Sequence, residues 1–232
     1  MRQWHLPRAD AAFVAAMEDV LAVYARPVDP ARPLVCFDES GKALQRDRRP
    51  ALPPEPATAD HPGRPARIDS EYARNGNANL LLWTAPHLGR RGIRVTTQRR
   101  AQEWAAAMRH LVEEDFPAAE RIVLVLDNLN THTAAALYIT FPAVIARRIW
   151  EKLEVHYTPK HASWLNIAEI ELSVLRRQCL DRRIPDADTL TREVTAWSAD
   201  RNRRQTGVTW HFTTTDARIK LKRLYPEPIY AN

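Results

Sequence analysis

The feature that most constrains the fold is an acidic residue at the end of an apolar run, and it occurs twice. Asp38 follows the run at residues 34–37, and Asp127 follows the longer run at residues 122–126. Apolar runs of this length predict buried β-strands. A carboxylate at the end of a buried strand is costly unless a cation or a hydrogen-bond donor meets it. The chain is therefore expected to build a charged site at the ends of two strands.

Each acid also has a simpler explanation. Asp38 could be a turn residue ahead of Gly41, and Asp127 could cap the helix expected after it. Asp127 is harder to dismiss, because it opens a polar cluster at the C-terminal end of a buried strand, where open α/β sheets build their sites. The other members of that cluster are Asn128, Asn130, Thr131 and His132.

Periodicity along the chain predicts one domain with a mixed α/β sheet flanked by helices. An unbroken apolar run between two helices, as at residues 121–126, is typical of a central strand covered on both faces. The expected strands are residues 34–38, 79–85, 92–97, 121–126 and 153–157. The expected helices are residues 11–24, 99–116, 133–149 (in spite of Pro142), 164–180 and 187–202, followed by a basic tail.

The segment at residues 42–67 is expected to be a long loop. It is polar and rich in proline, with Pro50, Pro53, Pro54, Pro56, Pro62 and Pro65. Proline excludes a regular helix or a central strand there. Loops of this length in compact domains are functional or disordered as a rule.

Composition narrows the class of protein and its partners. The 232 residues are 45% hydrophobic, with no stretch as long as a membrane span. The N-terminus lacks an apolar signal core, so we expect a cytoplasmic protein without a membrane partner. Cys36 and Cys179 are expected to be buried free thiols. The net charge of +6 and the pI of about 9.6 weakly favour a polyanionic partner.

A third acid lies in the helix expected at residues 164–180. At 100° per residue, Glu169 shares a polar sector with Ser173, Arg176 and Arg177. Glu171 falls between two apolar stripes instead, which favours Glu169 as the site residue and leaves Glu171 a supporting or structural role. Three carboxylates suit a hard divalent cation, Mg²⁺ above all. Such a site indicates phosphoryl transfer on nucleic acid.

Three segments carry a family resemblance. They are Phe37-Asp38-Glu39, then Leu126-Asp127-Asn128 with His132 following, and lastly residues 157–169, which include Leu165-Asn166-Ile167-Ala168-Glu169. They resemble the catalytic domain of bacterial insertion-sequence transposases related to the mariner elements, which carry a D-D-E triad on an RNase H-like fold. The resemblance covers residues 34–225 and gives the third catalytic place to Glu169.

The resemblance implies domain boundaries and shows two departures. Residues 34–225 would be the catalytic domain, residues 226–232 a tail, and residues 1–33 a helix and linker left from the region that joins a missing helix-turn-helix domain. Only about 30 residues precede Leu34, which is too few for that DNA-binding domain. The spacing from Asp127 to Glu169 is also longer than in mariner relatives, with the extra residues expected in the helix at 133–149.

The resemblance also implies the chemistry. Asp38, Asp127 and Glu169 would hold two Mg²⁺ ions, with Mn²⁺ as a substitute, about 3.5–4 Å apart. Such a site cleaves the phosphodiester at a transposon end and joins the freed 3′-OH to target DNA. The implied partners are double-stranded DNA, a second copy of the chain and a partner carrying the helix-turn-helix domain.

Further side chains are weaker candidates for DNA contact. Asn128 and His132 would position a phosphate or the active-site loop, with structural hydrogen bonding as an equal alternative. Lys160, His161 and Trp164 precede the third helix and would contact the backbone or stack on a base, although a core role suits Trp164 better. Arg176 and Arg177 lie on the helix face of Glu169. Two other functions stay open, an inactive or regulatory transposase fragment and an unrelated RNase H-like nuclease.

Overall fold

The computed structural model describes residues 10–227. Its strands are β1 (Leu34–Asp47), β2 (Tyr72–Ala85), β3 (Arg90–Thr96), β4 (Ile122–Leu126) and β5 (Leu153–Tyr157). Its helices are α1 (Ala11–Tyr24), α2 (Ala101–His110), α3 (Ala134–Thr140), α4 (Ala143–Glu151), α5 (Ile167–Leu175), α6 (Ala187–Arg203) and α7 (Thr214–Lys220). Short helical turns are η1 (Pro86–Leu88), η2 (Leu111–Asp115), η3 (Ser163–Leu165), η4 (Arg176–Leu180) and η5 (Lys222–Leu224).

The strands form one five-stranded mixed sheet in the order β3-β2-β1-β4-β5. β1, β2 and β3 are antiparallel, whereas β4 and β5 run parallel to β1. β1 therefore occupies the centre, and its neighbour β4 ends on the same side of the sheet. β1 continues beyond the end of β4, so Asp127, which follows β4, lies next to the part of β1 that contains Asp38. The topology confirms the expected mixed sheet flanked by helices.

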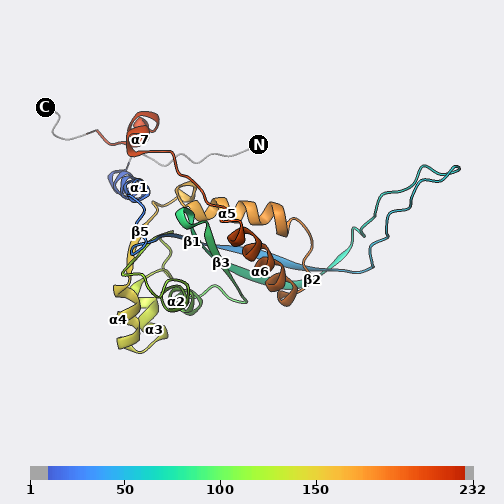
Figure 1. The fold of residues 1–232 in the computed structure, drawn as a ribbon, viewed down its shortest axis with the longest axis horizontal. Helices are drawn as coiled ribbons and strands as arrows, with labels where there is room; N and C mark the ends of the chain where they lie inside the picture. The colour runs from blue at the N-terminus through green and yellow to red at the C-terminus, as the bar shows by residue number, and fades with distance from the viewer. Residues whose placement is uncertain (1–9, 228–232) are drawn as a thin grey trace.

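Each face of the sheet packs against its own layer of helices (Figure 1). α1, α5 and α6 cover the face to which Cys36 of β1 points, and α2, α3 and α4 cover the face of Phe37. Successive side chains of a strand point to opposite faces. Asp38 therefore points toward the α5 layer and Glu39 toward the α2 layer.

Helix α1 is part of the core rather than an appended segment. Its apolar side chains Phe13, Met17, Val20 and Leu21 are buried against β1 and α5. The Tyr24 hydroxyl at its last turn donates to the carbonyl of Leu165 at 2.7 Å and accepts from the Ile167 N–H at 3.4 Å. α1 thus supports the start of α5. The first nine residues of the expected segment 1–33 lie outside the described residues, as do tail residues 228–232.

Residues 48–71 form a long hairpin arm that projects from the ends of β1 and β2 (Figure 1). Three isolated bridges hold its strands together, Leu52 with Arg67, Glu55 with Arg64, and Thr58 with His61. The sequence predicts neither this ladder nor the extra length of β1 and β2, because the segment is polar and broken by proline. The expectation of a loop at residues 42–67 without a central strand is wrong for residues 42–47, which hold no proline and extend the central strand β1. Residues 48–67 contain no helix, as expected.

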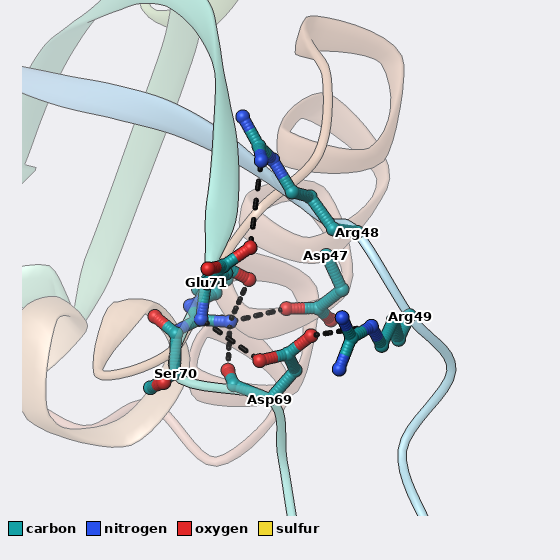
Figure 2. Close-up of polar contacts among 7 residues, drawn as sticks. Asp47, Arg48, Arg49, Asp69, Ser70 and Glu71 are labelled. Carbon is teal, nitrogen blue, oxygen red and sulfur yellow. Dashed lines mark hydrogen bonds and ion pairs between the residues drawn. The ribbon is translucent and has the colours of Figure 1, made fainter.

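The base of the arm is fixed by charged groups (Figure 2). Arg48 pairs with Glu71 at 3.4 Å and Arg49 with Asp69 at 3.6 Å across its strands. Arg183, from the segment between η4 and α6, contacts Asp47 at 2.7 Å. The same guanidinium donates to the main-chain carbonyls of Asp69 at 2.6 Å and Ser70 at 3.0 Å. Arg183, which is partly buried, therefore fixes the direction in which the arm leaves the body.

Four other expectations need correction. The helix expected at 133–149 is broken into α3 and α4 at Pro142, which has no N–H to donate and disfavours helical backbone before it. The helices expected at 99–116 and 164–180 are shorter, and each ends in a π-turn. The basic tail contains α7, which Thr213 and Asp216 begin with a capping box. Cys179 is only partly buried, whereas Cys36 is buried as expected, and both thiols are free.

Within the described part, the helices are too short or too polar to cross a bilayer.

Candidate active site

Asp38 lies on the central strand and is 8% exposed. Its Oδ1 accepts a hydrogen bond from the Glu39 N–H at 2.7 Å. It is paired with Leu82 of β2 within the sheet, so it is a strand residue and not a turn residue. Its side chain faces the layer that contains α5, which carries Glu169.

The charges of the other two predicted acids affect the pKa of Asp38. Burial is the largest cause that raises this pKa to about 7; the charges of Glu169, Asp127 and Glu39 also raise it, and the hydrogen bond from the Glu39 N–H lowers it. The negative charges of all three predicted acids therefore act on one another. A set of repelling oxygen ligands in a partly buried site favours either a proton or a cation.

Asp127 directly follows β4, where the strand ends beside β1. Its side chain is 33% exposed. Helix α3 begins with Thr133 as its N-cap, so Asp127 does not cap that helix. The position at a strand end beside the central strand agrees with the sequence prediction.

Glu169 lies in the first turn of α5 and is exposed. Asn166 caps this helix, because its Oδ1 accepts from the Ala168 N–H at 3.1 Å. The other end of the same amide donates to the carbonyl of Phe37 at 2.8 Å. One buried side chain therefore fixes the start of the Glu169 helix against the residue before Asp38. Asn166 was part of the recognised motif, but its dual role could not be derived from spacing.

Glu171 has a different environment from Glu169. It is 0% exposed, and its carboxylate lies 3.1 Å from Arg91 Nε and 2.9 Å from Arg201. Arg91 also contacts the Asn202 side chain at 3.1 Å. Glu171 thus joins α5 to β3 and α6 as a buried structural acid, which agrees with the helical-face argument that separates it from Glu169.

The weaker candidates fall into three groups. Asn128, Lys160 and His161 line one hollow of about 380 Å³ beside the end of β4. Arg176 and Arg177 are exposed in η4, after the helix of Glu169. Trp164 is 46% exposed and meets Phe212 edge-on at 6.0 Å, so it is not a core residue.

His132 is completely buried, which favours the structural alternative for this residue. Its Nδ1 lies 2.7 Å from Asp127 Oδ1, and its Nε2 lies 3.1 Å from Glu39 Oε1. Burial alone would lower the pKa of His132, but these two carboxylates outweigh it and raise the pKa to about 9. Glu39 could not be predicted as a partner of His132, since the two residues are 93 positions apart.

The carboxylate oxygens of Asp38, Asp127 and Glu169 are ligands that suit a divalent metal. The three side chains are not arranged around a common point in this structure, however. Within residues 10–227, no group of three or more acidic, histidine or cysteine side chains is arranged to hold a metal ion. The candidate metal ligands are all carboxylates. Burial raises the pKa of Asp38, and the negative charges of Glu169 and Asp127 add to this effect. Hard divalent cations prefer such oxygen ligands. Exposed Glu169 and partly exposed Asp127 could adjust around Asp38, so the residues fit such a group.

The chain belongs to the DDE superfamily endonuclease family, whose pattern matches residues 33–191. The match begins just before β1 and contains all three predicted acids. No curated protein sequence matches the chain.

Solved structures show the same fold. The catalytic domain of Mos1 mariner transposase aligns with a TM-score of 0.55 and 14% identity, covering 97% of this chain and 100% of that domain. The Mos1 mariner paired end complex with Mn aligns with a TM-score of 0.55 and 16% identity, covering 89% of this chain and 62% of that one. The Mos1 strand transfer complex aligns with a TM-score of 0.55 and 14% identity, covering 97% and 65%. The fold is therefore that of an RNase H-like transposase catalytic domain, and the chain spans less than two thirds of the Mos1 chains in these complexes.

Proposed function

We propose that the chain is the catalytic domain of a DNA transposase, which cleaves DNA strands at transposon ends and transfers the 3′-OH to target DNA. The carrying observation is that Asp127 follows β4 where that strand ends beside β1, the strand of Asp38, and that Asn166 joins the start of the Glu169 helix to the residue before Asp38. Membership of the DDE endonuclease family and the Mos1-like fold support the same reaction class. Family membership also argues against an unrelated RNase H-like nuclease.

Asp38, Asp127 and Glu169 are the proposed ligands of divalent metal. Mos1 complexes with Mn and with Mg support this choice of ion, and two ions are proposed. Divalent ions in such sites supply positive charge to the attacking and leaving oxygens of phosphoryl transfer. The chain itself contributes a rigid strand for Asp38, a helix start fixed by Asn166 for Glu169, and a strand end for Asp127.

DNA is proposed to cross the surface at the ends of β1 and β4. Lys160 and Asn128 line the hollow beside Asp127 and would contact phosphate oxygens. Arg176 and Arg177 would contact the backbone on the other side of Glu169, with their charge rather than with base recognition. Recognition of the end sequence is assigned to a helix-turn-helix partner, and pairing of two ends to a second copy of the chain.

The test is nicking of supercoiled plasmid DNA by the purified chain with Mg²⁺ or Mn²⁺, with EDTA and Asp127→Asn as controls. We expect nicking that requires the metal and disappears in the variant. Equal nicking by both proteins would identify a contaminant and count against the assigned acids. Mn²⁺ binding without nicking would favour a regulatory or incomplete fragment that needs its DNA-binding partner.

A further inference from the structure

The ring of His132 is held in one orientation by its surroundings. One face stacks on Trp104 at 5.5 Å with an angle of 27°, and Phe37 meets the ring edge-on at 5.6 Å. The main-chain carbonyl of His132 accepts from the Tyr157 hydroxyl at 2.7 Å. Because the ring cannot turn without losing these contacts, its two nitrogens point in fixed directions.

Both nitrogens point at carboxylates. Nδ1 contacts Oδ1 of Asp127 at 2.7 Å and also faces the carbonyl of that residue at 3.3 Å. Nε2 contacts Oε1 of Glu39 at 3.1 Å. Both ring nitrogens therefore lie within contact distance of a carboxylate oxygen.

Glu39 is itself held in place. It is 3% exposed at its side chain, and its second oxygen lies 3.2 Å from Nε of Arg99. One oxygen of Glu39 therefore meets His132 and the other meets Arg99, which fixes the carboxylate that faces Nε2.

The two oxygens of Asp127 differ in accessibility. Oδ1 is buried and accepts no hydrogen bond of regular geometry, and its contact is the ion pair with Nδ1 of His132 at 2.7 Å. The side chain as a whole is 33% exposed. The accessible part of the carboxylate therefore includes the other oxygen. A carboxylate with one oxygen held in this way offers the second as a single, directed ligand.

We propose that His132 is a positioning residue, which holds one oxygen of Asp127 so that the other faces a divalent cation, and that Glu39 in turn fixes His132. The inference rests on the proposed function, because it takes Asp127 as a metal ligand. Removing hydrogen-bond partners of ligating side chains typically weakens metal binding by roughly 10–100-fold. His132 does not contact the metal or the DNA in this role.

Two substitutions separate the two nitrogens. The amide nitrogen of Asn lies near the position of Nδ1, so His132→Asn keeps a donor toward Asp127. The amide nitrogen of Gln lies near the position of Nε2, so His132→Gln keeps the contact to Glu39 and loses the one to Asp127. Leu137→Ala is the control for stability, because it truncates a fully buried side chain of the following helix and removes no polar group.

The measurement is Mn²⁺ affinity of the whole chain by electron paramagnetic resonance, beside the Mn²⁺ concentration that half-saturates nicking. We expect His132→Gln to weaken both by about 10-fold or more, with nicking recovered at high Mn²⁺. His132→Asn should restore most of the affinity, and Leu137→Ala should leave it unchanged in spite of a lower melting temperature. A structural role alone would lower the nicking rate at saturating Mn²⁺ and would not distinguish Asn from Gln.

Glu39→Gln provides a second route if His132→Gln does not fold. It replaces the carboxylate that meets both Nε2 and Arg99, so His132 is held less firmly and Mn²⁺ affinity should fall. Wild-type affinity in both His132→Gln and Glu39→Gln, or in Glu39→Gln alone where the other is unfolded, would overturn the inference while leaving the proposed function intact. A wild-type chain that binds no Mn²⁺ would overturn the proposed function and the inference with it.

Discussion

Asn166 donates a hydrogen bond from Nδ2 to the main-chain carbonyl of Phe37 at 2.8 Å. This single contact joins the helix of the third acid to the strand of the first. The pairing of β1 with β4 ends at Cys36, one residue before Phe37, so the contact lies where the strand leaves its parallel neighbour. The relative position of Asp38 and Glu169 therefore depends on a side chain that is 1% exposed.

Asn166→Ser should separate the helix-capping role of Asn166 from its hydrogen bond to the carbonyl of Phe37. Serine remains a good N-cap, but its hydroxyl is too short to reach Phe37. We expect a loss of about 1–2 kcal/mol in unfolding free energy, as for a buried hydrogen bond, and a fall of about 10-fold in metal-dependent nicking. Urea unfolding and plasmid nicking measure the two effects. Asp186→Ser, which alters the N-cap of α6 away from the site, should leave nicking unchanged.

Glu169→Gln and Glu171→Gln should have opposite effects. Glu169 is exposed, so its substitution should change stability by less than about 0.5 kcal/mol and abolish metal-dependent nicking. Glu171 balances two arginines in the interior, so its substitution should cost about 3 kcal/mol or more. Denaturant unfolding of both variants is the direct comparison. A stable Glu171→Gln protein without metal-dependent nicking would reverse the assignment of the two acids.

Glu154 should confer an acid-sensitive part of the stability. It is bonded to Arg26 and Arg32 from the α1–β1 connection and to His156 of its own strand. Burial would raise the pKa of Glu154, but these bonds lower it to about 2. The stabilisation is therefore complete above the ordinary pKa of 4.5 and is lost as the pH falls through about 2.

Glu154→Gln should thus be less stable than the parent by about 1–2 kcal/mol at pH 7, after allowance for the solvent exposure of the arginines. The difference should shrink steadily below pH 4.5 and vanish near pH 2. Unfolding free energies across this range give the test, with Glu151→Gln, an exposed partner of Arg147, as the control. A difference that does not depend on pH would show that shape rather than charge stabilises this site.

Arg183→Ala should loosen the hairpin arm and leave the body folded. The substitution removes the contact to Asp47 and the hydrogen bonds to the carbonyls of Asp69 and Ser70. We expect faster hydrogen exchange at the bridging amides of Leu52, Glu55, Arg64 and Arg67, and faster tryptic cleavage at the arginines of the arm. The matched control is Arg182→Ala, which removes an adjacent arginine that pairs with Glu193 instead. Equal exchange in both variants would show that the arm holds its own shape.

Local sequence patterns predict the two strands next to Asp38 and Asp127 and the helix face of Glu169. The apolar runs before Asp38 and Asp127 lie in β1 and β4 as predicted, and the helical-face argument separated exposed Glu169 from buried Glu171. These inferences succeed because burial of an apolar strand or stripe is read directly from periodicity.

The remainder depended on contacts between distant segments. The arm has no apolar alternation, so its ladder and its attachment through Arg183 left no local signal. For His132 the sequence leaves a phosphate-positioning and a structural role equally open, and only its packing against Trp104 and its pairing with Glu39 decide for the structural one. Pro142 is a signal in the sequence that the helix expected at 133–149 breaks there. The capping box at Thr213 is likewise a signal that a helix begins in the tail.

The prolines of the arm have a consequence for how this chain behaves in solution. A projecting two-stranded ribbon normally exposes rows of backbone donors and acceptors on which another chain can add a strand, which is a route to aggregation. Proline has no N–H to donate, and six prolines interrupt the arm between Pro50 and Pro65. The arm can therefore extend far from the body with edges that pair poorly with strands of other chains. Whatever meets it must recognise side chains, because a continuous backbone ladder cannot form along it.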